Sequence, residues 1–290
     1  MDRKMSGLLQ DKVAIITGGS RGIGKAIAER FAQEGCNLMI VARTSPELDQ
    51  TAHEIQTKFQ VKVLKHQTDI SNESDVASMI QSTISEFGKI DILINNAATI
   101  GPMGGIESIN TDDFFNTLRT NIGGTIFCIR AVLPYMKQND CSWVINLSGG
   151  GALYPLPYYD AYSASKTSIV RLTENFAIEF EKYNIMVTAI SPGAVNTKMF
   201  EEQLKADKDS IGEKNWEALQ NRLASGGDPI DKAAELALYL VNEQRNEFNG
   251  KVISAIWDDW ENISKNKDKL IDTDIHAMRR IVPKDRDMEL

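Results

Sequence analysis

The stretch KVAIITGGSRGIGKAIAERFAQEG, from Lys12 to Gly35, decides the fold. It begins with an apolar run of strand length, turns through Gly18, Gly22 and Gly24, and continues as an amphipathic segment of helix length. Glycines in such a turn allow the backbone to approach a phosphate, and the following helix N-terminus offers free N–H groups to an anion. The stretch therefore predicts a strand–turn–helix unit that binds the pyrophosphate of a dinucleotide.

The same alternation of apolar and amphipathic segments continues along most of the chain. The further strand-like runs are NLMIVA, VKVLKHQ, DILINN, SWVINLS and IMVTAIS. Because these runs have no polar face, they predict a parallel sheet covered by helices on both sides. We expect a single α/β domain over residues 8–256 with a doubly wound, Rossmann-type parallel sheet. Residues 198–229 interrupt the alternation and are interpreted as an inserted lid.

Composition excludes several classes of function. The chain has 290 residues and a net charge of −8, so it has no electrostatic reason to bind nucleic acid or an anionic membrane. Its three cysteines and three histidines are widely spaced and suggest neither a disulfide framework nor a metal site. No apolar run has the length of a signal peptide or a membrane span. We expect a cytoplasmic protein whose partner is a small molecule.

A second informative stretch is YYDAYSASK, which places Tyr162 and Lys166 four residues apart in a helix-like segment. Residues at this spacing share one helix face. A phenol has an ordinary pKa of ~10, and a neighbouring positive charge lowers it. Such a pair is suited to proton transfer, although spacing alone favours the plainer interpretation of an aromatic residue and a lysine that only share a helix surface.

Taken together, the motifs resemble those of the short-chain dehydrogenase/reductase family. TGGSRGIG is similar to the family's TGxxxGxG loop, and YSASK is similar to its YxxxK motif. TDIS at 68–71, NNAA at 95–98, Asn121 and SPGAVNT at 191–197 follow in the family's order. The resemblance covers about residues 8 to 256. It implies an NADP(H)-dependent oxidoreductase that interconverts a secondary alcohol and a ketone.

The resemblance also implies roles for individual residues. Tyr162 corresponds to the general acid/base, Lys166 to the residue that lowers its pKa and holds the nicotinamide ribose, and Asn121 to the residue that positions a water. The Gly123–Gly124 pair would weaken a helix by about 1 kcal/mol per glycine and indicates a distortion beside Asn121. The implied cofactor-binding residues are Gly18, Ser20, Arg21, Gly22, Ile23, Gly24, Arg43, Asp69, Ile70, Asn95, Tyr162, Lys166, Pro192, Gly193 and Thr197.

Three of these assignments have plain structural alternatives. Asp69 resembles the residue that contacts adenine, but an Asp there could also cap the helix that begins near Asn72. Asn95 resembles an asparagine that stabilises the sheet beside the cofactor, with a strand-end turn as the alternative. Thr197 resembles a residue that contacts the nicotinamide carboxamide or a phosphate, with a helix N-cap as the alternative.

The end of the second strand, VART, favours NADP(H) over NAD(H). An NAD-binding chain usually carries an acidic residue here to bind the ribose 2′-OH. Ala42 has no carboxylate, and Arg43 follows it. Arg21 in the glycine loop is expected to face the same point, so that two guanidinium groups meet a 2′-phosphate. Two solvated arginines are the alternative.

The substrate-polarising serine of the family is displaced in this sequence. Counting thirteen residues back from Tyr162 gives Gly149, while Ser148 lies one place earlier. A one-residue slip turns a side chain to the other face of a strand, so Ser148 reaches the site only if the run Gly149–Gly151 re-aims it. Alternatively a water, a glycine N–H or Tyr159 supplies the donor. The missing serine is the only support for a catalytically silent nucleotide-binding scaffold, and the retained Asn121, Tyr162 and Lys166 speak against it. An epimerase or lyase that keeps the fold and uses the cofactor transiently is a further alternative.

The C-terminal part departs from the family pattern. KVISAIWDDW replaces a glycine-rich ending, and we expect Trp257 and Trp260 to close the core or a subunit interface. Residues 264–290 form a charged extension in which Ile271, Ile275 and Met278 fall on one face of a possible helix. A disordered terminus is the alternative. The resemblance further implies a homo-oligomer, a tetramer or a dimer.

Overall fold

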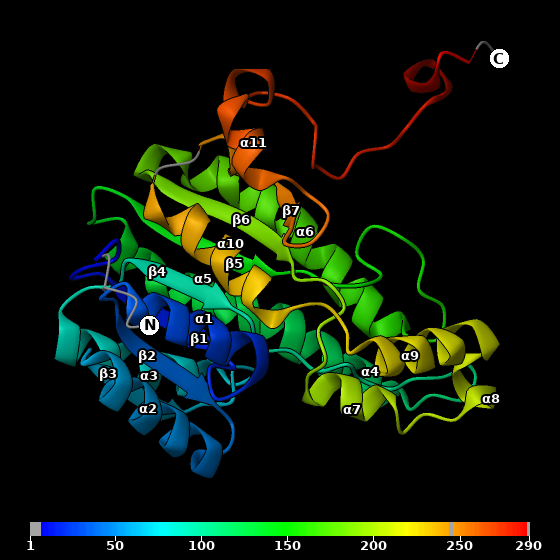
Figure 1. The fold of residues 1–290 in the computed structure, drawn as a ribbon, viewed down its shortest axis with the longest axis horizontal. Coiled ribbons are helices and arrows are strands. Elements are labelled where there is room, and N and C mark those ends of the chain that lie inside the picture. Colours follow the sequence, from blue (N-terminus) through cyan, green and yellow to red (C-terminus); the bar gives the residue numbers. More distant parts are fainter. Residues whose placement is uncertain (1–6, 244–245, 289–290) are drawn as a thin grey trace.

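The computed structural model describes residues 7–243 and 246–288. Its centre is a seven-stranded, all-parallel sheet in the order β3-β2-β1-β4-β5-β6-β7 (Figure 1). The strand order reverses direction between β1 and β4, which confirms the predicted doubly wound fold. The strands are β1 (Val13–Thr17), β2 (Asn37–Ala42), β3 (Val63–Gln67), β4 (Ile92–Asn95), β5 (Ser142–Leu147), β6 (Ile185–Ser191) and β7 (Val252–Ser254).

Helices cover both faces of the sheet because its strands are apolar on both sides. One core includes Ala14 and Ile16 of β1 and is covered by α1 (Gly22–Gln33), α2 (Ser45–Phe59) and α10 (Ile230–Asn242). The other core includes Ile15 and is covered by α3 (Glu73–Phe87), α5 (Gly124–Met136) and α6 (Asp160–Phe180). Adjacent residues of β1 therefore enter opposite cores, as strand geometry requires.

The long helix expected after residue 110 is interrupted. It begins as α4 (Thr111–Leu118), widens into a π-helical turn over Arg119–Gly123, and continues as α5. The interruption lies at Asn121 and at the first of the two glycines, which confirms the predicted distortion. Single π-turns of this kind often occur at functional sites.

Residues 198–229 form three helices outside the sheet alternation, namely α7 (Lys198–Gln203), α8 (Lys208–Ile211) and α9 (Glu213–Ser225). In Figure 1 these yellow-green and yellow helices lie together to one side of the sheet. They pack against the loops after β4 and before α6 in a small core that contains Ile100, Tyr159, Phe200, Ile211 and Leu219. We call residues 198–229 the lid.

The expected helix through Ile271, Ile275 and Met278 was wrong. The chain after α11 (Trp260–Lys265) forms short turns, because its backbone carbonyls are used by other elements. Thr273 and Ile275 carbonyls accept hydrogen bonds from Lys251 Nζ at 2.8 and 2.9 Å. The His276 carbonyl accepts from Val252 N at 2.9 Å, so the tail pairs with the outer edge of β7.

Only part of the expected C-terminal apolar contacts is present. Met278 packs against a buried cluster that includes Val170 and Val252, whereas Ile271 and Ile275 are exposed. Trp260 packs on Tyr239 with ring centroids 4.7 Å apart, as expected of a residue that closes the core. Trp257 is 82% exposed and does not close the core.

The remaining elements are short 3-10 turns at Glu181–Tyr183, Asn246–Phe248, Lys267–Lys269 and Pro283–Arg286. Over residues 7–243 and 246–288, no helix combines the length and the apolar character that crossing a bilayer requires.

Candidate active site

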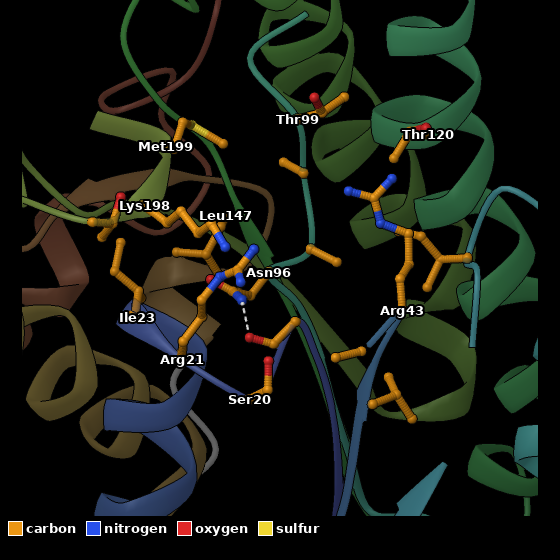
Figure 2. A pocket seen from close by; sticks show the side chains of 18 of the residues that line it. Ser20, Arg21, Ile23, Arg43, Asn96, Thr99, Thr120, Leu147, Lys198 and Met199 are labelled. Carbon is orange, nitrogen blue, oxygen red and sulfur yellow. Dashed lines mark hydrogen bonds between the residues drawn. The ribbon is translucent and has the colours of Figure 1, made fainter. Parts of the chain in front are cut away.

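A cleft opens at the carboxyl ends of the strands, where the sheet order reverses (Figure 2). This is the position at which open parallel α/β sheets bind their ligands. The loops after β1 to β6 and the first lid helix all contribute to it. The predicted residues that line the cleft are Gly18, Ser20, Arg21, Gly22, Ile23, Arg43, Ile70, Ser148, Tyr162, Lys166, Pro192 and Thr197.

The glycine loop forms a cradle that side chains would fill. Gly18 and Gly22 have φ values of +64° and +54°, in the left-handed region that favours glycine. A Cβ atom on Gly24 would lie 2.3 Å from the Gly18 carbonyl oxygen, so α1 can approach the turn only with glycine at that place. Gly24 itself does not line the cleft. A backbone cradle at the N-terminus of α1 fits a pyrophosphate group.

Asn96, which the sequence analysis did not single out, holds the glycine loop in place. Its Nδ2 donates to the carbonyl oxygens of Thr17 and Gly18 at 2.8 and 3.2 Å, and its backbone N donates to Thr17 Oγ1. Asn95 has a different position, since its Nδ2 donates to Asn146 Oδ1 at 3.0 Å inside the sheet and it does not line the cleft. The NNAA motif identified the right turn, but the second asparagine is the one at the cleft.

Arg21 and Arg43 both line the cleft but do not converge. Arg21 points toward Lys198 on one side, whereas Arg43 points toward Thr120 on the other side (Figure 2). Arg21 donates to Glu47 Oε2 at 2.6 Å, in an ion pair that is exposed to solvent. The cleft therefore contains both predicted cations, one of which already has a carboxylate partner.

Asp69 lies behind the cleft and not in its lining. Its Oδ1 accepts hydrogen bonds from Ser71 N and Ser71 Oγ at 2.9 and 2.7 Å. Burial raises the pKa of this carboxyl, but the Ser71 hydrogen bonds and the positive charges of Arg43 and Arg119 lower the pKa overall. Asn72, and not Asp69, is the N-cap of α3. Ile70 lines the cleft.

Tyr162 and Lys166 lie together in the cleft wall on α6. Lys166 Nζ lies 5.6 Å from the Tyr162 ring centroid and donates to the Leu147 carbonyl at 2.7 Å. Burial lowers the pKa of Lys166 to about 8. Burial also raises the pKa of Tyr162 to about 12, and the charge that opposes this rise is Arg222 of the lid. The expected lowering of the Tyr162 pKa is thus not found, because burial disfavours the charged phenolate and this effect dominates.

Asn121 connects two parts of the cleft wall without lining it. Its Oδ1 accepts from Thr99 N, and its Nδ2 donates to the Thr99 carbonyl and to Ser165 Oγ, each at 2.9 Å. Thr99 lines the cleft, and Ser165 belongs to α6. The Asn121 side chain is therefore fully bonded, and it fixes the loop after β4 against the helix that carries Tyr162.

Position 149, and not 148, faces the Tyr162 hydroxyl. A Cβ atom on Gly149 would lie 2.5 Å from the Tyr162 hydroxyl oxygen. Ser148 lines the cleft, is 3% exposed, and its Oγ has no hydrogen-bond partner among the described residues. A buried hydroxyl without a partner requires an explanation, and a ligand in the cleft would supply one. Tyr159, the other candidate donor, is buried in the lid core.

The loop after β6 joins the cleft to the lid. Pro192 and Thr197 line the cleft, whereas Gly193 is turned away from it. Gly193 has a φ of +89°, and a Cβ there would lie 2.6 Å from Asp228 Oδ2. Thr197 is the N-cap residue of α7, but its side chain makes no capping hydrogen bond. Its hydroxyl is therefore not used for capping the helix.

The comparisons with known proteins agree on one family. The sequence profile described as short chain dehydrogenase matches residues 12–208. Levodione reductase of Leifsonia aquatica is 30% identical over 245 residues, which are 84% of this chain and 92% of that protein.

Solved structures of similar proteins have the same fold. NAD+-bound xylitol dehydrogenase is 25% identical with a TM-score of 0.79, over 85% of this chain and 98% of that one. L-Sorbose reductase from Gluconobacter frateurii, complexed with NADPH and L-sorbose, is 28% identical with a TM-score of 0.74, over 87% and 96% of the two chains.

Proposed function

The chain belongs to the short-chain dehydrogenase family, and from this we propose that it is an NADP(H)-dependent oxidoreductase that interconverts a secondary alcohol and a ketone. One observation carries the proposal. Tyr162 and Lys166 line the same cleft as the glycine loop, so a proton-transferring group stands beside a dinucleotide cradle. A nicotinamide dinucleotide, when bound, supplies or accepts the hydride.

The chain's own residues would hold this cofactor at several points. The backbone of the Gly18–Gly22 turn and the N-terminus of α1 are suited to the pyrophosphate. Lys166 is suited to the ribose next to the nicotinamide, and the free Thr197 hydroxyl is suited to its carboxamide. Similar solved structures contain either NAD+ or NADPH, so the proposed choice of NADP(H) rests mainly on Arg43, since Arg21 is paired with Glu47.

Tyr162 is suited to donate a proton to the substrate oxygen. With a pKa near 12, its phenol is protonated at neutral pH. Reduction of a carbonyl leaves negative charge on its oxygen, which a nearby phenol neutralises by proton transfer. Ser148 supplies a second hydrogen bond to that oxygen, since its buried hydroxyl otherwise has no partner among the described residues.

The direct test is an absorbance assay. Wild-type protein is mixed with NADPH or NADH and a panel of ketones, and with NADP+ or NAD+ and the matching alcohols. We expect a change in nicotinamide absorbance that Tyr162→Phe abolishes while NADPH binding, followed by fluorescence, persists. Tyr154→Phe is the matched control, because Tyr154 is 79% exposed on the loop before α6. Absence of turnover across the panel, or full activity of Tyr162→Phe, would contradict the proposal.

We also propose a homo-oligomer formed through the helices that carry or adjoin Asn121 and Tyr162. Two large apolar side chains support it, since Phe115 of α4 is 61% exposed and Ile178 of α6 is 76% exposed. A partner subunit that packs on these helices would cover both side chains. Light scattering of Phe115→Glu and Ile178→Glu, compared with wild type, measures whether the assembly depends on them.

A further inference from the structure

The lid contains a cation whose charge is not neutralised. Arg222 of α9 donates through Nε to Asn196 Oδ1 at 3.0 Å and through Nη2 to the Val195 carbonyl, both of which are uncharged oxygens. Within the described ranges it forms no ion pair, and its Nη1 makes no hydrogen bond. The residue is half-buried, and burial lowers its pKa. The charge of Asp228 offsets part of this effect, but a ligand that brings a carboxylate to the guanidinium would offset more of it.

Arg222 does not line the cleft, but it lies next to the lid core that covers Tyr162. Its guanidinium carbon is 4.1 Å from the centroid of the Phe200 ring. Phe200 belongs to the lid core, against which Tyr162 also packs. The charge of Arg222 lowers the Tyr162 pKa against the effect of burial, which is a second sign that the two groups are close. The guanidinium thus faces the inner side of the lid.

Asp228 is the carboxylate whose charge acts on Arg222. It raises the pKa of Arg222 by its charge but makes no ion pair with it. Its Oδ2 instead accepts a hydrogen bond from Ala194 N at 2.6 Å, which ties it to the loop after β6. Among the described residues, Arg222 therefore has no ion-pair partner and keeps one nitrogen without a hydrogen bond, while the Asp228 carboxylate is bonded to the loop after β6.

We propose that Arg222 binds a carboxylate of the substrate, so that this oxidoreductase acts on oxo acids and the corresponding hydroxy acids. The inference rests on the proposed function and specifies its substrate class. One guanidinium with one free nitrogen matches the single charge of a carboxylate, and guanidinium–carboxylate geometry is favourable. The carbonyl of the same substrate would face Tyr162.

The test compares each acid with its uncharged amide. The panel contains oxo acids with the carboxylate at increasing distance from the carbonyl, each paired with the corresponding oxo amide. Turnover is followed with NADPH. Binding is measured separately by calorimetry on protein saturated with NADP+, which cannot reduce the oxo compound. We expect the best acid to exceed its amide by about 10- to 100-fold in both kcat/KM and affinity, as for one charge-assisted hydrogen bond.

Three variants identify the residue responsible. Arg222→Met should remove the preference for the acid, and Arg222→Lys should keep part of it because the charge remains. Lys214→Met is the matched control, since Lys214 is an exposed cation on the same helix, and it should keep the full preference. The dissociation constant of NADPH is measured for each variant, because Arg222 also holds the Val195–Asn196 loop.

The outcomes separate the inference from the proposed function. Acids that bind more tightly than amides without any turnover would support the carboxylate site and contradict the oxidoreductase function. Equal behaviour of acids and amides with wild-type protein would overturn the carboxylate site. The carboxylate site would also be overturned if Arg222→Met lowered kcat/KM for acids and amides by the same factor and weakened NADPH binding as well. Arg222 would then act only by holding the Val195–Asn196 loop.

Discussion

Gly149 and Tyr162 lie so close together that a Cβ atom at position 149 would be 2.5 Å from the Tyr162 hydroxyl oxygen. The Tyr162 hydroxyl thus occupies the space that a side chain at 149 would need. The resemblance to the family places the polarising serine at this position, and the glycine found here leaves room for the Tyr162 hydroxyl.

The first prediction follows from this contact. Gly149→Ala should displace the Tyr162 hydroxyl and lower kcat by about tenfold or more, because small misplacements of a reacting group are costly. Gly150→Ala is the control, since its Cβ would meet only Leu156 Cδ2 at 3.8 Å, an ordinary contact. Neither glycine has a positive φ, so alanine itself causes no backbone strain. Equal kcat values for the two variants would show that the contact is unimportant.

The second prediction concerns Ser148. If its buried hydroxyl binds the substrate oxygen, Ser148→Ala should lower kcat by about 10²–10³ while NADPH affinity stays nearly unchanged. Steady-state kinetics and fluorescence titration measure the two quantities. Ser163→Ala is a useful control, because Ser163 Oγ is also buried without a partner among the described residues but does not line the cleft. Wild-type turnover in Ser148→Ala would transfer the role to another donor.

The third prediction concerns cofactor choice. Arg43→Ala should lower kcat/KM for NADPH by about tenfold and change that for NADH little, since only the 2′-phosphate distinguishes them. Glu47→Gln should raise NADPH affinity, because Arg21 is then free of its carboxylate partner. Arg130→Ala is the control, as Arg130 pairs with Glu73 and does not line the cleft. Identical ratios of NADPH to NADH efficiency in all variants would contradict the NADP(H) preference.

The fourth prediction uses the pKa of Lys166, which burial lowers from an ordinary value of 10.5 to about 8. Between pH 8 and 10.5 the unfolded chain therefore binds more protons at this site than the folded chain, and the free energy of unfolding gains from this group as pH rises. The Tm of wild type should therefore rise relative to the Tm of Lys166→Met between pH 7.5 and about pH 9.5.

Two features keep this measurement interpretable. Tyr162 has its folded pKa raised from 10.0 to about 12, so it lowers stability only above pH 10 and lies outside the window used. Lys214→Met, which alters an exposed lysine, should follow wild type at every pH. A constant difference between wild type and Lys166→Met across the window would show that the Lys166 pKa is not lowered by folding.

The fifth prediction concerns the C-terminal tail. Deleting residues 271–290 removes the Thr273 and Ile275 carbonyls that accept from Lys251 Nζ. Loss of hydrogen bonds to a charged group costs about 1.5–3 kcal/mol, so Tm should fall by on the order of 5 °C. Deleting only residues 279–290 keeps these bonds and Met278, and should change Tm little. Equal Tm values for both truncations would show that the contacts with Lys251 contribute nothing to stability.

Much of this protein could be predicted from the sequence because the signals are local. A buried strand, a glycine turn and a helix follow one another within Lys12–Gly35, and each is specified by its own residues. The resemblance of its motifs to one family pointed to Tyr162, Lys166, Ser148 and Thr197, and all four line one cleft at the carboxyl ends of the strands. Helix spacing likewise predicted that Tyr162 and Lys166 share a face.

The tertiary structure decided what depends on contacts between distant segments. The approach of Gly149 to Tyr162, the position of Arg222 over Phe200, and the pairing of the tail with β7 join residues far apart in the chain. The apolar spacing of the tail indicated a helix, but the partners of its carbonyls, Lys251 and Val252, lie outside that segment. No local pattern encodes such contacts, because they arise only when the sheet, the lid and the tail are packed together.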